Sequence, residues 1–273
     1  MKKVNIMICG FVLLLGTLPT FAQKSLMQSI SFGLGTAYYL GDVAQTPEML
    51  KPGGAVAYTR YLTPILAGRL GMFYSGYAAS DSAGTNKNRG IQFKSPLWET
   101  SAVLMVDLLG KRNAKANNNT FFSPYLYGGI ALFSFNPQGK IGDKWYNLQP
   151  LGTEGQFILK DKYPKPYKQV QFALPVGLGF QYKFSRQWGL NFDVGFRKTF
   201  TDYMDDVSGS YPNKVDLLAF SGPEAVYLSD PTGINEQGKP RGDNQKTDSY
   251  IFTHLSLVFY PSRRVCPAFG KKK

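Results

Sequence analysis

The sequence contains very few of the residues that metal and nucleophile chemistry needs. Among 273 residues there are two cysteines, and His254 is the only histidine. Cys9 lies in an apolar segment that we expect to be removed, so Cys266 is left without an internal disulfide partner. Zinc sites built from His and Cys, and catalytic triads built on a histidine, therefore lack material. We predict no cofactor and no enzyme of these classes.

The chain also lacks an apolar run long enough to cross a membrane as a helix. The longest candidate, Val4–Leu18, is shorter than the ~20 residues that a bilayer requires. Lys2 and Lys3 precede this run, and Thr20–Ala22 follows it with a small-x-small pattern. A basic start, a short apolar core and such a pattern are typical of a cleaved signal peptide. We therefore predict an exported protein.

The sequence shows no clear helical periodicity. Many of its segments instead alternate apolar residues with small or polar ones. In Trp188–Phe200 the apolar side chains share one face, opposite Asn191 and Asp193. Val170–Phe184 repeats this pattern, and only Ser185–Gln187 separate the two segments. Period two indicates strands, and the short connection indicates an antiparallel hairpin. Six further strands are predicted at Ser29–Leu40, Gly54–Leu62, Leu66–Tyr77, Pro96–Leu108, Ser123–Phe135 and Ser249–Tyr260.

The strand faces opposite the apolar ones carry charges, which separates two architectures. Each unpaired ion in a dry soluble core would cost on the order of several kcal/mol. A membrane barrel instead turns its apolar face to lipid and its polar face inward, whereas a water-facing sandwich is the main alternative. We predict an all-β, eight-stranded antiparallel transmembrane outer-membrane β-barrel. Because such barrels leave little internal room, a packed ion-pair network is favoured over conduction. Its predicted members are Arg69, Glu99, Lys183, Asp193, Arg197 and His254.

The predicted connections are short at one barrel end and long at the other, which orients the molecule. Outer-membrane barrels keep short turns and both termini in the periplasm. The predicted division is a signal peptide (1–22), a barrel (23–260) and a basic periplasmic tail (261–273). The long segment Thr201–Asp248 holds nine acidic and four basic residues, whereas the periplasmic pieces are basic. A basic rim fits anionic lipid head groups, an acidic periplasmic protein or solubility, and charge alone leaves all three open. Export argues against nucleic acid as a partner.

Five short strings add a resemblance to a known family. They are YYLGD (Tyr38–Asp42), SPLWE (Ser95–Glu99), FNP (Phe135–Pro137), LQPLGTEGQ (Leu148–Gln156) and TDYMDDVS (Thr201–Ser208), in this order. The sequence thus resembles the PorG family, an outer-membrane component of the type IX secretion system of Bacteroidetes-type bacteria. The resemblance implies a non-enzymatic barrel, in contact with outer-membrane lipids, that anchors a periplasmic ring of a PorK-like lipoprotein and a PorN-like protein.

The resemblance names motif residues but assigns no docking residue. The motif residues of the two longest strings are Leu148, Gln149, Pro150, Leu151, Gly152, Thr153, Glu154, Gly155, Gln156, Thr201, Asp202, Tyr203, Asp205 and Asp206. From charge and placement alone, our candidate docking residues are Lys111, Arg112, Lys115, Arg186, Arg263 and Arg264.

Three of the motif carboxylates lie within six residues, and they support several interpretations. Calcium prefers loops with regularly spaced acidic ligands, and D-x-x-D-D lacks that spacing. We instead expect Asp202, Asp205 and Asp206 to order a rim loop through backbone amides, paired with Arg197 and Lys198. A catalytic cluster would need a nucleophile or second acid beside it.

Two more segments leave a choice between binding and structure. Leu148–Gln156 either binds a partner or caps the barrel mouth, and its apolar residues favour capping. The tripeptide Arg241-Gly242-Asp243 matches a short adhesive motif, but tripeptides recur by chance. An independent barrel with an envelope-structural, adhesive or small-solute pore role is the alternative function. A lipid- or peptide-modifying barrel enzyme has the least support.

Overall fold

A computed structural model describes residues 27–84, 86, 88–109, 121–158, 163–242 and 247–261. Its main strands are β1 (Gln28–Leu40), β2 (Pro52–Tyr61), β3 (Leu66–Ser80), β4 (Gln92–Asp107), β5 (Phe121–Phe135), β8 (Val170–Lys183), β9 (Trp188–Thr199) and β10 (Ser249–Phe259). Each corresponds to one predicted strand. β3 and β4 run farther than predicted, to Ser80 and from Gln92.

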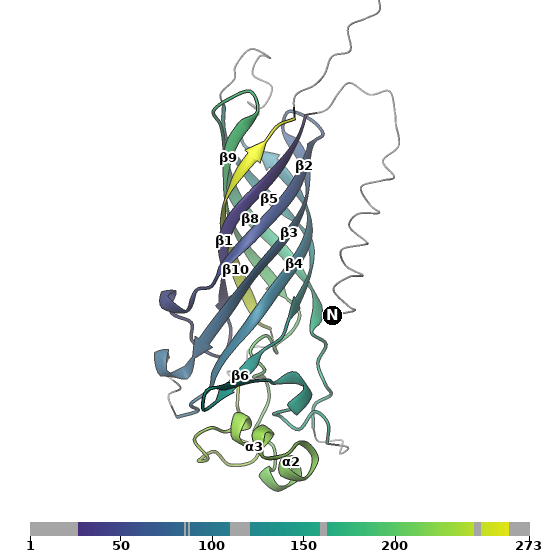
Figure 1. The fold of residues 1–273 in the computed structure, drawn as a ribbon. Helices are drawn as coiled ribbons and strands as arrows, with labels where there is room; N and C mark the ends of the chain where they lie inside the picture. The colour runs from purple at the N-terminus through teal and green to yellow at the C-terminus, as the bar shows by residue number, and fades with distance from the viewer. Residues whose placement is uncertain are drawn as a thin grey trace, which may run out of the picture.

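These eight strands close into a barrel (Figure 1). Every neighbouring pair is antiparallel, and the first strand completes the ring by pairing with the last, from Ile30↔Phe259 to Leu40↔Ser249. The predicted closed antiparallel barrel is therefore confirmed. Among the described residues, no helix is long and apolar enough to span a membrane.

The two ends of the barrel differ in the length of their connections (Figure 1). At the short-turn end, residues 62–65 and 184–187 each join two strands. At the long-loop end lie elements that the alternation did not predict. They are η1 (Pro47–Met49), η2 (Asp81–Ala83), β6 (Gln138–Ile141), β7 (Lys144–Asn147), η4 (Gln149–Leu151), α2 (Lys214–Ser221) and α3 (Pro223–Ser229).

The outer face of the barrel is an exposed apolar belt. On β8 the outward side chains are between 42 and 61 % exposed, namely Val170, Phe172, Leu174, Val176, Leu178, Phe180 and Tyr182. Aromatic pairs lie toward both ends of this face, with the Tyr74 and Trp98 rings 4.3 Å apart and the Trp188 and Phe259 rings 5.0 Å apart. A continuous apolar belt flanked by aromatic residues is typical of a surface that faces lipid.

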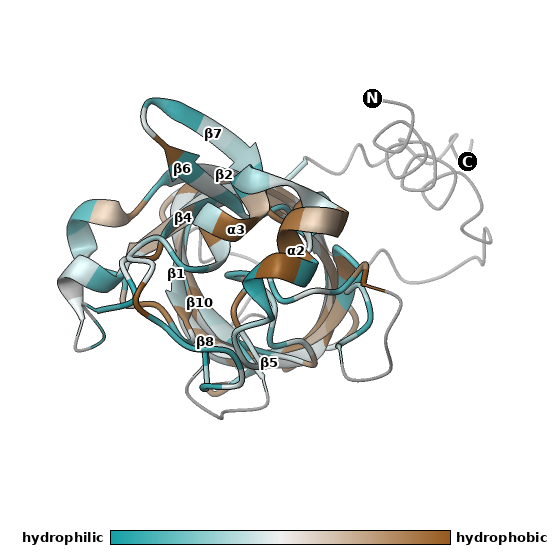
Figure 2. Cartoon of the chain, turned by 90° about the horizontal axis from the view of Figure 1, so that it is seen from below, coloured by the Kyte–Doolittle hydropathy of each residue, from teal (hydrophilic) through white to brown (hydrophobic). Residues whose placement is uncertain are grey.

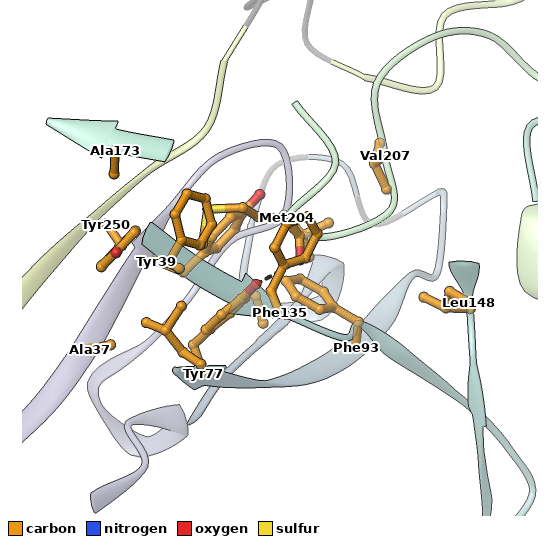
Figure 3. Close-up of a cluster of buried hydrophobic side chains, with 14 of the residues drawn as sticks. Ala37, Tyr39, Tyr77, Phe93, Phe135, Leu148, Ala173, Met204, Val207 and Tyr250 are labelled. Atoms are coloured by element: carbon orange, nitrogen blue, oxygen red, sulfur yellow. Dashed lines mark hydrogen bonds between the residues drawn. The ribbon is translucent and has the colours of Figure 1, made fainter. Parts of the chain in front are cut away.

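Aromatic side chains fill the barrel interior near the long loops (Figure 3). The rings of Tyr39 and Tyr77 stack at 5.4 Å, and Phe93 meets Tyr39 edge-on at 5.5 Å. The Tyr77 hydroxyl donates to the backbone oxygen of Met204 at 2.8 Å, and the Met204 side chain is fully buried in this cluster. Because Met204 belongs to the loop after β9, that loop is seated in the mouth of the barrel.

Candidate functional site

Two ion pairs cross the middle of the barrel interior. Arg69 Nη1 lies 3.0 Å from Asp193 Oδ1, and Arg197 Nε lies 3.1 Å from Glu99 Oε2. His254 Nε2 is 3.1 Å from the other oxygen of Asp193, its register partner on the neighbouring strand. All five side chains are buried or nearly so. In this medium of low dielectric constant, each member of the two ion pairs depends on its partner. The structure thus brings five of the six predicted interior residues together.

Inward tyrosines, which the sequence reasoning missed, complete the network. Tyr125 donates to Asp193 Oδ1 at 2.6 Å, Tyr250 donates to Glu99 Oε2 at 2.7 Å, and Arg197 donates to the Tyr127 hydroxyl at 3.2 Å. The sequence signal that could have revealed these tyrosines is their alternation with small residues on the inward face of the strands. A cavity of only about 30 Å³ remains beside these groups, enough for one or two water molecules. The middle of the barrel is thus filled by side chains.

The sixth predicted interior charge lies elsewhere. Lys183 is the last residue of β8, at the short-turn end, and its Nζ is 4.7 Å from the centre of the Tyr260 ring. A strand tilts through the full height of the barrel, so a residue at its end cannot meet partners at its middle. Lys183 therefore belongs to the rim and not to the central network.

At the long-loop end, the two longest motif strings pack against each other. Asp206 accepts hydrogen bonds from the hydroxyls of Thr153 and of Tyr167, the latter at 2.7 Å. Glu154 Oε1 accepts from the backbone N–H of Ser208 at 2.9 Å. The acidic stretch is therefore an ordered part of the mouth. We call this assembly of residues 148–158 and 201–211 with Arg241 the mouth plug.

The expected partners of the acidic stretch were wrong. Arg197 points into the barrel and pairs with Glu99, while Lys198 donates to Thr247. The cation that the plug uses is Arg241, 3.2 Å from Glu154 Oε1 and 3.9 Å from Asp206 Oδ2. The nearest bases in sequence were unsuitable because strand alternation turns Arg197 inward and Lys198 outward.

Capping by Leu148–Gln156 agrees with the structure, although for a different reason than expected. Leu148 is buried, but Pro150 is exposed and Leu151 is only half-buried. The buried polar groups of Thr153 and Glu154 make the contacts to the acidic stretch. The string thus covers the mouth through hydrogen bonds more than through apolar burial.

The adhesive tripeptide is excluded as an accessible motif because Arg241 is buried. Its side chain is 1 % exposed and also donates to the backbone oxygens of Ser229, at 3.1 Å, and of Asp206. Asp243, the third residue of the tripeptide, lies outside the described residues. A receptor cannot reach a guanidinium that is enclosed by its own loops.

Carboxylates outnumber cations in the plug. The Tyr39 hydroxyl lies 2.6 Å from Asp205 Oδ2 and 3.1 Å from Asp248 Oδ1. Burial raises the pKa of Asp205 well above its usual range, and the nearby Asp248 raises it further. Burial, with Asp202 and Asp42, raises the pKa of Asp248 to about 8, and burial raises the pKa of Asp206 to about 6 against the opposing effect of Arg241. The closed plug therefore favours the protonated forms of Asp205 and Asp248.

The three carboxylates of the acidic stretch do not converge on one point. Asp202, Asp42 and Asp248 each place an oxygen within 4.8 Å of the others. Asp205 and Asp206 are instead hydrogen-bonded to Tyr39 and Tyr167. The D-x-x-D-D string is therefore not a calcium loop of consecutive ligands.

These shifts predict that the plug loosens as pH rises. A carboxyl whose pKa is raised by folding stabilises the fold fully below its unfolded pKa and loses that effect as pH rises through the folded value. For Asp248, which faces Asp42, Asp202, Asp205 and Tyr39, the loss begins above its unfolded pKa of about 4 and is complete near pH 8. Hydrogen exchange of residues 201–211, corrected for its intrinsic pH dependence, should accelerate from about pH 5 and level off above about pH 8.

Asp248→Asn is the matched variant for this prediction. An asparagine oxygen still accepts from the Met204 N–H, which lies 2.8 Å from Asp248 Oδ2, but it has no carboxyl to titrate. We expect the exchange rate of the variant to rise much less over the same pH interval. An equal pH dependence in both proteins would show that Asp248 does not control the plug.

Of the predicted docking residues, the structure describes Arg186 alone. It lies exposed in the turn between β8 and β9, at the short-turn end. Lys111, Arg112, Lys115, Arg263 and Arg264 lie outside the described residues, as do the predicted signal peptide and all but the first residue of the basic tail.

Comparisons with known proteins place this barrel in a family. OprG from Pseudomonas aeruginosa aligns with a TM-score of 0.44 and 11% identity over 88% of this chain and 98% of that chain. Ail from Yersinia pestis aligns at 0.39 and 9% over 87% and 99%, and a major outer membrane protein from Thermus thermophilus aligns at 0.39 and 14% over 86% and 99%. No curated protein matches in sequence. A family profile matches residues 8–222, and the chain belongs to this family, described as a domain of unknown function, DUF6089.

Proposed function

We propose that this protein is a non-enzymatic outer-membrane barrel that anchors the periplasmic ring of a type IX secretion machine. The carrying observation is that the barrel wall is apolar while its interior is filled. An apolar wall fits lipid. Within the described part of the chain, the small interior cavity and the plugged mouth leave no route for solute, so we place the function on the surfaces of the barrel.

The filled interior also weighs against the alternative roles. A small-solute pore would need a path past the pairs of Arg69 with Asp193 and Arg197 with Glu99. The adhesive alternative loses its motif, because Arg241 is enclosed in the plug. Anchoring requires neither a channel nor an accessible tripeptide.

The resemblance to the PorG family supplies the ring as the partner. Residues of all five strings lie in or beside the closed mouth. Tyr39, Leu97 and Phe135 belong to the buried cluster beneath the long loops. Thr153 and Asp206 belong to the plug. The strings therefore contain residues that close the barrel. The docking surface is inferred separately, from charge.

Charge suggests that the short-turn end is the docking surface. Outer-membrane barrels place short turns in the periplasm, which would expose Arg186 and the predicted basic rim to a periplasmic ring. The rim pieces carry Lys111, Arg112, Arg263 and Arg264 without an acidic residue beside them in sequence. Such a rim attracts an acidic protein surface and orients its approach.

Charge reversal tests this proposal. The variant Arg112→Glu, Lys115→Glu, Arg263→Glu and Arg264→Glu should retain at least about tenfold less of a PorK-like lipoprotein and PorN-like protein after gentle detergent extraction. The matched control reverses four lysines of the long-loop end, Lys51, Lys144, Lys165 and Lys168, with the same change in net charge. Mass spectrometry of the co-purified proteins gives the readout. Equal retention by both variants, or a native barrel that emerges alone at low salt, would contradict the proposal.

A further inference from the structure

A polar extension of the sheet rises beyond the apolar belt. β6 pairs with the first part of β4, with Lys94 opposite Gln138, and β7 pairs with β6, with Lys140 opposite Trp145. A side chain at Gly139 would meet Leu228 at 2.7 Å and Leu148 at 2.9 Å, so this position faces the plug. Since side chains alternate along a strand, the neighbours Gln138 and Lys140 face away from it.

This outward face combines cations, an aromatic ring and amides. Lys94 Nζ lies 4.1 Å from the centre of a ring of Trp145. Asn147 Oδ1 accepts from Gln138 Nε2 at 2.9 Å, which holds the amides in the same layer. Lys140 Nζ is 3.7 Å from Asp143, whose side chain is fully exposed. We call Lys94, Lys140 and Trp145 with these amides the outward lysine face.

The outward lysine face adjoins the lipid-facing belt. Trp98 follows Lys94 by four residues on β4 with the same alternation, and it pairs with Tyr74 on the outside of the barrel. Four residues of a tilted strand rise roughly 10 Å. Figure 2 shows the β6–β7 hairpin reaching outward past the ring of barrel strands. The face therefore lies just beyond the aromatic border of the belt, at the height of lipid head groups.

We propose that the outward lysine face binds the phosphorylated sugar head group of a glycolipid in the outer leaflet. Lysine ammonium groups form charge-assisted hydrogen bonds with phosphate, and an amphipathic tryptophan suits the border between head groups and acyl chains. The continuity of the face with the apolar belt lets one lipid contact both, with its phosphate at Lys94 and Lys140 and its acyl chains on the belt. This inference shares with the proposed function only the outer-membrane placement, and it involves no secretion partner.

Binding of diphosphoryl lipid A to the purified full chain in detergent micelles tests the inference. Lys94→Gln/Lys140→Gln should weaken this binding by about tenfold, about threefold for each of the two charge-assisted contacts. The matched control is Lys183→Gln, which removes another lysine placed over an aromatic ring, at the opposite end of the barrel. The control should bind like the unaltered protein, and heat-modified gel mobility confirms that each variant is folded.

Two further ligands distinguish a lipid phosphate from free inorganic phosphate as the bound group. Monophosphoryl lipid A should bind more weakly than diphosphoryl lipid A, and free inorganic phosphate should compete only at far higher concentration. Should the double variant misfold, Lys140→Gln alone, at a partly exposed side chain, should still weaken binding about threefold. Unchanged binding by a folded lysine variant, an equal loss in Lys183→Gln, or equally effective competition by free phosphate would each overturn the inference. None of these outcomes depends on recovering the periplasmic ring.

Discussion

Arg241→Met is expected to release the mouth plug while the barrel stays closed. Arg241 is the cation shared by Glu154 and Asp206, and its Nη1 is also hydrogen-bonded to the Asp206 backbone. Removing one partner of a buried ion pair leaves uncompensated buried charge, which costs about 3–5 kcal/mol. The direct contacts between the two strings, from Thr153 to Asp206 and from Tyr203 and Ser208 to Glu154, all use these two carboxylates. Loss of their shared cation should therefore separate the strings.

Hydrogen exchange of residues 148–158 and 201–211 measures this release, with protection in β8 and β9 as the internal reference. Exchange in the plug should accelerate by at least about a hundredfold, the factor that corresponds to 3 kcal/mol. Lys239→Met is the control, because Lys239 is exposed and, among the described residues, its side chain pairs only with the exposed Glu236 three residues away. A plug that remains as protected as before would show that Arg241 is not its central contact.

Asp193→Leu is expected to destabilise the barrel itself. Asp193 is fully buried and lies between Arg69 and His254, with the Tyr125 hydroxyl as a further donor. The leucine would leave the Arg69 guanidinium without its carboxylate inside the barrel. We expect the free energy of unfolding to fall by about 3–5 kcal/mol.

A double-mutant cycle tests this second prediction by urea unfolding in micelles. Arg69→Leu/Asp193→Leu removes both charges, and replacing a whole buried ion pair with apolar residues is often nearly neutral. The double variant should therefore be more stable than Asp193→Leu. Additive costs of the two substitutions would contradict the account of Arg69 and Asp193 as a coupled buried pair.

Alternation in the sequence was sufficient to predict the barrel strands but not the loops. The ends of β8 and β9 were predicted to within a residue, because the outer face is apolar along all of β8 and along β9 as far as Phe196. The start of β4 was missed because the outward positions Gln92 and Lys94 lie beyond the belt and are polar. The helix α2 is short, and its signal was local, since the Asn213 side chain accepts from the N–H groups of Val215 and Asp216.

The same distinction applies to the candidate site. The interior charges were predictable because each sits on the polar face of a long alternating strand. Arg241 was not, because its partners Glu154 and Asp206 come from different parts of the chain and meet only when the long loops close over the mouth. Sequence proximity suggested Arg197 and Lys198 instead, and the strand geometry separates both from the acidic stretch.

The anchoring claim is tested most directly by photo-crosslinking in the native membrane. A photoreactive residue replaces Arg186 in the exposed turn at the short-turn end, and the control places it at the exposed Lys165 of the long-loop end. We predict crosslinks from position 186 to a PorK-like lipoprotein or a PorN-like protein, and none to these proteins from position 165. Ring crosslinks from position 165 alone, or no ring crosslink from position 186 of a correctly inserted barrel, would contradict the account.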